Sequence, residues 1–332
     1  MIQSLFSRQT AALLLLCAAL PACSESTKTG KGNKNNHADS RLQLQQIYEP
    51  SGAVQLADGR VLVVEDEAKR AFSLLDFKNG SLHENEAADK ALMAAFDRTL
   101  SDLEALAQDG EGWIYAVSSH SETKQNERQA EREHFIRFKI NGNKAEQISY
   151  APNLKDALLK NESVRKSIAA QSGRQIDFNT MNIEGLHYDT GSGRLLLAFR
   201  DPLPLVVAVD NPQDVFGKGS EPKFGEVAVL KINGGGIRSL TYDPELKTYL
   251  LSNEITGSNG KGQSQLWTWD GRAASAPAAL DLPEASQLKN IEAVESVKVD
   301  GKPYLLLMGD EGSKKKQRGA RYLLVDYAKL KK

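Results

Sequence analysis

The chain has few cysteines, few aromatic residues and almost no net charge. Two of its 332 residues are cysteine, 7% are aromatic, and 42 Lys and Arg balance 43 Asp and Glu. Two cysteines cannot form a disulfide framework, and a balanced charge excludes a protein that binds nucleic acid by bulk electrostatics. With 40% apolar and 26% charged residues, the composition is that of a folded protein.

The apolar run at the N-terminus predicts a signal peptide. Residues 11–20 are apolar, follow a segment with the single charge Arg8, and are too few to span a bilayer. The run ends in LPAC at residues 20–23, which resembles the lipobox of bacterial lipoproteins. That resemblance implies removal of residues 1–22 and attachment of diacylglycerol to Cys23. The residue after this cysteine is Ser24, whereas an aspartate there would imply retention in the inner membrane. By this resemblance, the protein is sorted to the outer membrane of a Gram-negative envelope and faces the periplasm.

The mature protein is expected to be a folded domain on a lipid anchor. Cys17 leaves with the signal peptide, so Cys23 has no cysteine partner for a disulfide. Residues 23–40 contain no large apolar side chain and are expected to form a flexible tether. Residues 41–330 then make up one domain, expected to be a monomer held at the membrane by its lipid.

Five copies of one pattern follow the tether. Each copy has a short apolar strand, a turn, a second strand with a nearly continuous apolar run, and a polar end. The copies begin at Ser51, Asp102, Asn182, Gly236 and Asn290. Four antiparallel strands per copy at a spacing of about 50 residues are typical of β-propeller blades. We therefore expect an all-β fold, a single propeller of about five four-stranded blades.

Two features depart from the regular repeat. The fifth copy lacks a fourth strand, and residues 41–49 are strand-like without a copy of their own, so we expect this N-terminal segment to close the ring. The interval between the second and third copies is longer by about 27 residues, and residues 153–171 have the apolar spacing of an inserted helix. Six blades is the alternative if residues 171–181 contain strands.

Several repeats resemble a known bacterial family. The segments NGGGIRSLTYD at 233–243 and SGAVQLADGRVLVVEDE at 51–67, with the NIEGL and NIEAV strand starts, resemble the family named domain of unknown function 3616. The resemblance covers most of residues 51–326; it implies a propeller-like fold and supplies no activity. The DLEAL start at Asp102 is similar over a short stretch to esterase-like propellers related to phytase, which implies hydrolysis of phosphoric esters.

The repeats also place charged residues at equivalent positions. In an antiparallel blade the first strand starts on the face where the second strand ends, so these positions should converge at one mouth of the central channel. The strand starts supply Glu104, Glu184, Arg238 and Glu292; the ends of second strands supply Glu65, Asp66, His120, Arg200, Asp201, Asn253, Glu254 and Asp310. Placing charged groups beside apolar strands raises the free energy of the folded state unless the groups are solvated, paired with one another or bound to an ion.

Three functions remain open for this predicted site. Its oxygens could ligate Ca²⁺ or another divalent cation, with Glu104, Glu184, Glu292 and Asp310 as the candidate ligands. It could hold a small polar or anionic ligand, or an envelope protein, and a metal-assisted phosphoesterase would hydrolyse a bound phosphate ester. It could also be a water-filled channel of paired side chains in a structural envelope scaffold. The sequence favours binding without chemistry and leaves open whether the protein is an enzyme.

Overall fold

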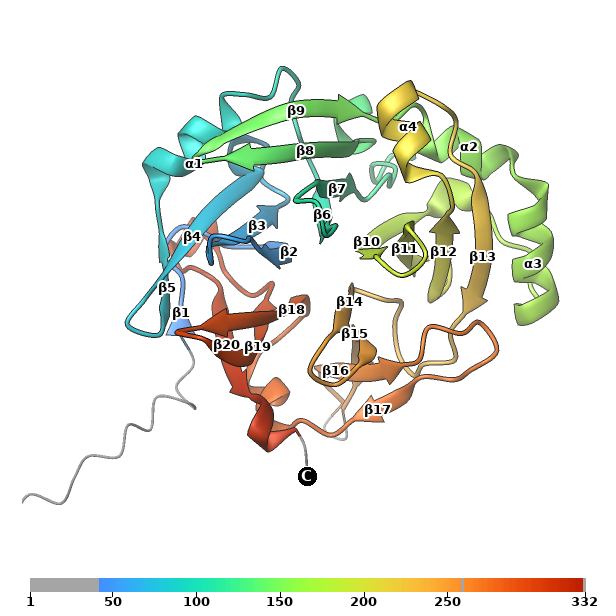
Figure 1. The fold of residues 1–332 in the computed structure, drawn as a ribbon. Helices are drawn as coiled ribbons and strands as arrows, with labels where there is room; N and C mark the ends of the chain where they lie inside the picture. Colours follow the sequence, from blue (N-terminus) through green and yellow to red (C-terminus); the bar gives the residue numbers. More distant parts are fainter. Residues whose placement is uncertain (1–41, 258–259, 331–332) are drawn as a thin grey trace, which may run out of the picture. The chain divides into compact units, whose positions relative to one another are not determined.

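The computed structural model describes residues 42–257 and 260–330; the predicted signal peptide, Cys23 and the tether lie outside them. The described residues belong to one compact unit and form five four-stranded antiparallel sheets arranged around an axis (Figure 1). The predicted fold class, a five-bladed propeller, is therefore confirmed. No helix of the described residues is long and apolar enough to cross a membrane.

The blades follow one another along the chain. The first holds β2 (Pro50–Gln55), β3 (Val61–Glu65), β4 (Phe72–Lys78) and β5 (Ser81–Glu84); the second holds β6 (Leu103–Gln108), β7 (Ile114–Ser118), β8 (Phe135–Asn141) and β9 (Lys144–Tyr150). The third holds β10 (Asn182–Asp189), β11 (Arg194–Asp201), β12 (Leu205–Val209) and β13 (Phe224–Val229); the fourth holds β14 (Ser239–Asp243), β15 (Thr248–Thr256), β16 (Gly262–Trp269) and β17 (Ala278–Leu280). The fifth holds β18 (Ile291–Val299), β19 (Lys302–Gly309), β20 (Arg321–Asp326) and β1 (Leu42–Gln43).

The N-terminal strand closes the ring, as predicted. Strand β1 pairs antiparallel with β20, so the fifth blade is built from both ends of the described chain (Figure 1). The backbone continues this pairing, because Leu44 N donates to Ala320 O at 2.9 Å and Ala320 N donates to Ile47 O at 2.8 Å. Leu44 and Ile47 are buried between the first and fifth blades. The N-terminal and C-terminal segments of the domain therefore stabilise each other.

The predicted inserted helix is two helices. These are α2 (Leu154–Lys160) and α3 (Glu162–Ser172), which lie outside the third blade (Figure 1). Asn161 separates them, because its backbone is extended and its side chain caps α3 by accepting from Val164 N at 2.9 Å. Residues 171–181 contain the end of α3 and a short 3₁₀ helix, Phe178–Thr180, and no strand. The six-bladed alternative is therefore wrong.

Apolar side chains fill the five spaces between neighbouring blades. Strands β3, β7 and β12 are buried along their whole length, which explains their nearly continuous apolar runs in the sequence. The sequence analysis did not predict two further helices, α1 (Glu86–Met93) and α4 (Pro212–Lys218). Near the axis the first strands crowd together. A Cβ on Gly185 would lie 2.8 Å from Ala198 Cβ and 3.0 Å from Leu240 N, so glycine is required there.

Candidate functional site

The first strands β2, β6, β10, β14 and β18 surround the axis and contact one another around the ring (Figure 1). Four of them carry a β-bulge at the same place, one or two residues after the strand begins. The bulged residues are Ser51, Glu104, Glu184 and Glu292. A bulge turns a side chain away from its normal alternation, and here all four line one cavity on the axis.

That cavity has a volume of about 230 Å³. We call it the channel mouth. Its lining residues are Glu49, Ser51, Asp66, Asp102, Glu104, Ser121, Arg132, Asn182, Glu184, Arg200, Arg238, Glu292 and Asp310. Seven of the predicted site residues are among them: Asp66, Glu104, Glu184, Arg200, Arg238, Glu292 and Asp310. The aligned repeats therefore brought together acids and arginines that lie up to 244 residues apart (66 to 310).

Two arginines of the channel mouth are held by its own carboxylates. Arg238, just before β14, places Nη1 against Glu292 Oε1 and 3.4 Å from Glu184 Oε2, and its side chain is only 11% exposed. Arg200, at the end of β11, donates from Nη1 to Glu184 Oε1 at 2.8 Å. Arg238, nearly buried between two carboxylates, is therefore not free to bind a phosphate group, whereas Arg200 is 40% exposed and uses only Nη1 in its hydrogen bond.

A pair of aspartates lies on the opposite side of the channel mouth. Asp102 Oδ2 accepts from Arg132 Nη2 at 2.6 Å and Nε at 3.0 Å, and also from Ser119 Oγ. Partial burial, the charge of Asp102 and a hydrogen bond between the two carboxyl groups raise the pKa of Asp66 to about 7. Asp66 therefore titrates near neutral pH.

Glu104 differs from its neighbours because nothing holds it. Among the described residues, no side chain or backbone group donates a hydrogen bond to its carboxyl group or forms an ion pair with it. Burial and the negative charges of Glu184 and Glu292 raise its pKa well above the ordinary value. Burial, Asp310 and Glu184 also raise the pKa of Glu292, although Arg238 is beside it. The channel mouth is therefore short of positive charge.

Three predicted site residues face away from the channel mouth. Glu65 is 1% exposed and accepts from Tyr48 N at 2.8 Å, so it fixes the segment after β1, and burial raises its pKa to about 7. His120 is fully buried, with Nδ1 2.9 Å from Ser118 O, and burial lowers its pKa to about 4. Neither lines the channel mouth.

Asn253, the third of these residues, secures the loop before β14. Its Nδ2 donates to Asn233 O at 2.7 Å, and its Oδ1 accepts from Trp267 Nε1 at 2.9 Å. Two other predicted residues lie at the rim and are exposed: Asp201, 3.7 Å from Arg200 Nε, and Glu254, 3.8 Å from Arg238 Nη2. Their side chains add negative charge beside the cavity without lining it.

The sequence analysis missed several residues of the channel mouth, chiefly Asp102 and Arg132. Asp102 directly precedes the first strand of its blade and has a positive φ of 59°, which turns it toward Asp66. Its acidic character at the start of a repeat was visible in the sequence. Arg132 comes from the long charged loop between β7 and β8, where no repeat position marks it.

A divalent cation gains no support from this arrangement. Across residues 42–257 and 260–330, no group of three His, Cys, Asp or Glu side chains is placed to hold a metal ion. Of the predicted ligands, Glu184 and Glu292 are paired with Arg238, and Asp310 Oδ2 accepts from Asn290 Nδ2 at 2.9 Å. Their oxygens are therefore directed to arginine and amide hydrogens.

No family model and no curated protein sequence matches the chain. Among solved structures it is similar to the α-L-arabinofuranosidase PaAbf62A from Podospora anserina in complex with cellotriose, with a TM-score of 0.46 and 12% identity over 88% of this chain and 93% of that one. The catalytic domain of Coprinopsis cinerea GH62 α-L-arabinofuranosidase has a TM-score of 0.46 and 12% identity over 86% and 94%. The major Malassezia sympodialis allergen Mala s 1 has a TM-score of 0.41 and 13% identity over 84% and 78%. Likenesses this distant say nothing about activity, and the resemblance to domain of unknown function 3616 stays a prediction.

Proposed function

We propose that this protein is a lipid-anchored β-propeller of the bacterial envelope that binds a small organic cation, such as a primary amine, at the channel mouth. The predicted signal peptide and lipidated Cys23 support anchoring in the outer membrane with the propeller facing the periplasm. The observation that carries the binding proposal is Glu104, a carboxyl group without a partner in a cavity where acids outnumber arginines.

The charge count favours a cation. Seven acidic side chains and three arginines line the channel mouth. Burial and the excess of neighbouring carboxylates raise the pKa values of Asp66, Glu104 and Glu292, so these groups hold their protons more tightly than free carboxyl groups do. An ammonium group supplies the missing positive charge and three hydrogen-bond donors, so it replaces those protons. A cavity of about 230 Å³ limits the ligand to a small molecule.

The alternatives are less well supported. A phosphate ester would have to displace Glu184 and Glu292 from Arg238, which argues against a phosphoesterase. A metal ion lacks a suitable group of ligands within the described residues. A purely structural channel would pair its charged groups with one another, as Arg200 and Arg238 do, but it gives no reason for Glu104 to stay unpaired.

A thermal-unfolding screen of the purified protein tests the proposal. Ethanolamine and putrescine should raise the unfolding temperature, whereas the uncharged analogues ethylene glycol and 1,4-butanediol should not. A ligand at about a hundredfold excess over its Kd stabilises the folded state by about 2.7 kcal/mol, which is readily measured. Glu104→Gln should abolish the shift, and Glu127→Gln, the same change at an exposed side chain that does not line the cavity, should preserve it.

Other results would refute the proposal. Stabilisation by Ca²⁺ that EDTA reverses would favour a metal site, and turnover of phosphate esters would favour the hydrolase. If no small molecule shifts the unfolding temperature, a scaffold role remains. Separately, recovery of the protein in the inner-membrane fraction would contradict the predicted location.

A further inference from the structure

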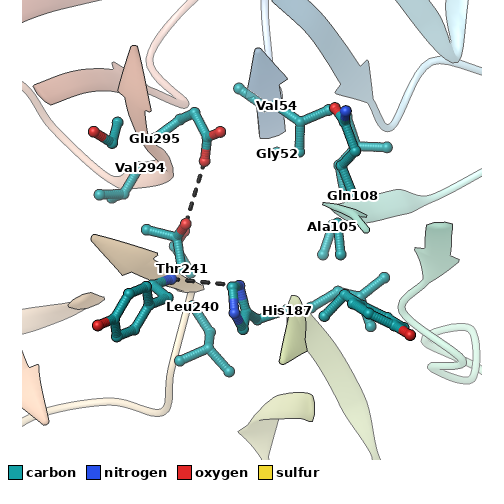
Figure 2. Close-up of a pocket in the computed structure, with 18 of the residues that line it drawn as sticks. Gly52, Val54, Ala105, Gln108, His187, Leu240, Thr241, Val294 and Glu295 are labelled. Carbon is teal, nitrogen blue, oxygen red and sulfur yellow. Dashed lines mark hydrogen bonds between the residues drawn. The ribbon is translucent and has the colours of Figure 1, made fainter. Parts of the chain in front are cut away.

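A second cavity lies at the other end of the same channel. Its volume is about 360 Å³, and it is lined by the later residues of all five first strands, β2, β6, β10, β14 and β18 (Figure 2). Ser51 and Glu184 line both cavities, so the two adjoin along the axis. We call this second cavity the lower pocket. Its size falls in the range of small-molecule sites in proteins.

The lower pocket carries almost no free charge. It has no lysine or arginine among its lining residues. The carboxylate of Glu295 accepts from Gln55 N at 3.3 Å and from Thr241 Oγ1 at 3.2 Å (Figure 2), and burial raises its pKa to about 7. Asp109 is occupied by the backbone N–H groups of Glu111 and Trp113, each at 2.9 Å. Glu184, the third acid of the lining, is paired with Arg200 and Arg238, so none of the three acids is left to attract a cation as Glu104 is.

The hydrogen bonding of His187 fixes where its ring proton lies. Its Nδ1 is 3.4 Å from Tyr242 N, and a backbone N–H can only donate, so Nδ1 is the acceptor (Figure 2). Burial lowers the pKa of His187 to about 4, so the ring is neutral and Nε2 carries the hydrogen. No acceptor for that hydrogen occurs among the described residues. His187 therefore offers a free donor to the lower pocket.

Gln108 offers the complementary group. Its side chain lines the lower pocket from the end of β6 (Figure 2). Its Oε1 is buried, and no donor among the described residues reaches it. A buried acceptor without a partner costs about 1 to 3 kcal/mol, so a ligand donor that met it would recover this energy. The lower pocket thus combines an unused donor and an unused acceptor.

An aromatic surface completes the lower pocket. Tyr242 lines the pocket, and 40% of its surface is exposed. Among the described residues, it is the large hydrophobic residue that is exposed. Its ring packs edge-on against Tyr249 at 5.3 Å, and His187 packs against Tyr249 at 5.4 Å, so these rings support one another. An exposed, supported ring of this kind can contact the apolar face of a ligand.

We infer that the lower pocket is a second binding site, for a small neutral polyhydroxylated molecule of monosaccharide size. Hydroxyl groups both donate and accept, so they match the free His187 Nε2–H and the free Gln108 Oε1. The C–H face of a sugar ring matches Tyr242, and the absence of lysine and arginine disfavours an anion. This site does not depend on the cation proposed for the channel mouth.

Titration of the purified full-length protein by ligand-observed NMR and calorimetry tests the inference. The ligands are glucose, galactose, mannose and ribose, with glucosamine and glucuronate as charged counterparts. We expect at least one neutral sugar to bind. Gln108→Met keeps the side-chain length but removes the acceptor, and it should weaken binding about five- to tenfold. Tyr242→Ser should weaken it by a similar factor, while Glu104→Gln in the channel mouth should leave sugar binding unchanged.

Unfolding temperatures show whether each variant is folded, so a folded variant with weaker binding supports the site. The inference is overturned if no neutral sugar binds at concentrations up to about 50 mM, where even millimolar affinities are visible. It is also overturned if folded Gln108→Met and Tyr242→Ser both bind the sugar as the unmodified protein does. Loss of sugar binding in Glu104→Gln would place the sugar in the channel mouth and equally refute the assignment.

Discussion

Replacing Glu104 by glutamine should stabilise the protein, and increasingly so as the pH rises. The carboxyl group is half-buried, lacks a partner among the described residues, and faces Glu184 and Glu292. Its pKa is raised in the folded state and ordinary in the unfolded state, so the folded protein holds this proton more tightly. Stability contributed by Glu104 is therefore fully present below about pH 4.5 and falls as the pH rises toward the folded-state pKa. Glutamine keeps the shape and never ionises.

The size of the effect follows from proton linkage. One group that is protonated when folded and ionised when unfolded changes the free energy of unfolding by at most about 1.4 kcal/mol per pH unit. Because Glu104 faces cavity water, we discount this limit by about half. Between about pH 5 and pH 7 the difference in unfolding free energy between Glu104→Gln and the unmodified protein should therefore grow by about 1 to 1.5 kcal/mol.

Urea unfolding at a series of pH values measures this difference. Glu127→Gln is the matched control, because Glu127 is exposed on a loop, and its unfolding curves should follow those of the unmodified protein at each pH. A difference for Glu104→Gln that is independent of pH would show that Glu104 has an ordinary pKa. A difference that shrinks with rising pH would show that the folded state stabilises the ionised carboxylate. Either result would refute our reasoning about the channel mouth.

Three further predictions concern the fold and the membrane anchor. Gly185→Ala should lower the free energy of unfolding by about 1 to 3 kcal/mol, measured with urea, because the added Cβ would lie 2.8 Å from Ala198 Cβ. Lys155→Met should cost about 2 kcal/mol in the same assay, because the buried Nζ donates to His120 O at 3.0 Å and that carbonyl would lose its partner. Cys23→Ser should abolish lipidation of the protein, as seen by loss of metabolic labelling with palmitate.

Much of the fold was predictable because the repeats are regular. Five copies, spaced by about 50 residues except at one insertion, predicted the blade number, and the unassigned segment before Ser51 predicted the closing strand. The break in the inserted helix at Asn161 was not predicted, because apolar spacing continues across it while the backbone does not. Local capping overrode the periodic pattern there.

The candidate site was predictable only where blade position determines side-chain direction. The bulges aim Glu104, Glu184 and Glu292 at the axis, and aligned repeats were sufficient to find them. At the ends of second strands, neighbouring residues face opposite sides, so Asp66 lines the channel mouth while Glu65 is buried beside it. Sequence alignment alone cannot distinguish two such neighbours.

The lower pocket was missed for a different reason. Its polar residues Gln108, His187, Thr241 and Glu295 lie inside the first strands, where a single polar residue looks like ordinary strand alternation. Only the closed ring brings the five strand ends together. That Gln108 Oε1 lacks a hydrogen-bond donor can be recognised only in the folded structure, where all of its neighbours are placed.

Calorimetry of amine binding in two buffers with different ionisation enthalpies tests the central claim most directly, because it counts the protons released. The account predicts that ethanolamine or putrescine binds near pH 7 with release of up to about one proton, and that affinity rises with pH as the carboxyl groups of the channel mouth ionise. Glu104→Gln should lose both the binding and the proton release. Amine binding without proton release, or binding that Glu104→Gln leaves unchanged, would contradict the claim that Glu104, an unpaired carboxyl group with a raised pKa, is the group that receives the cation.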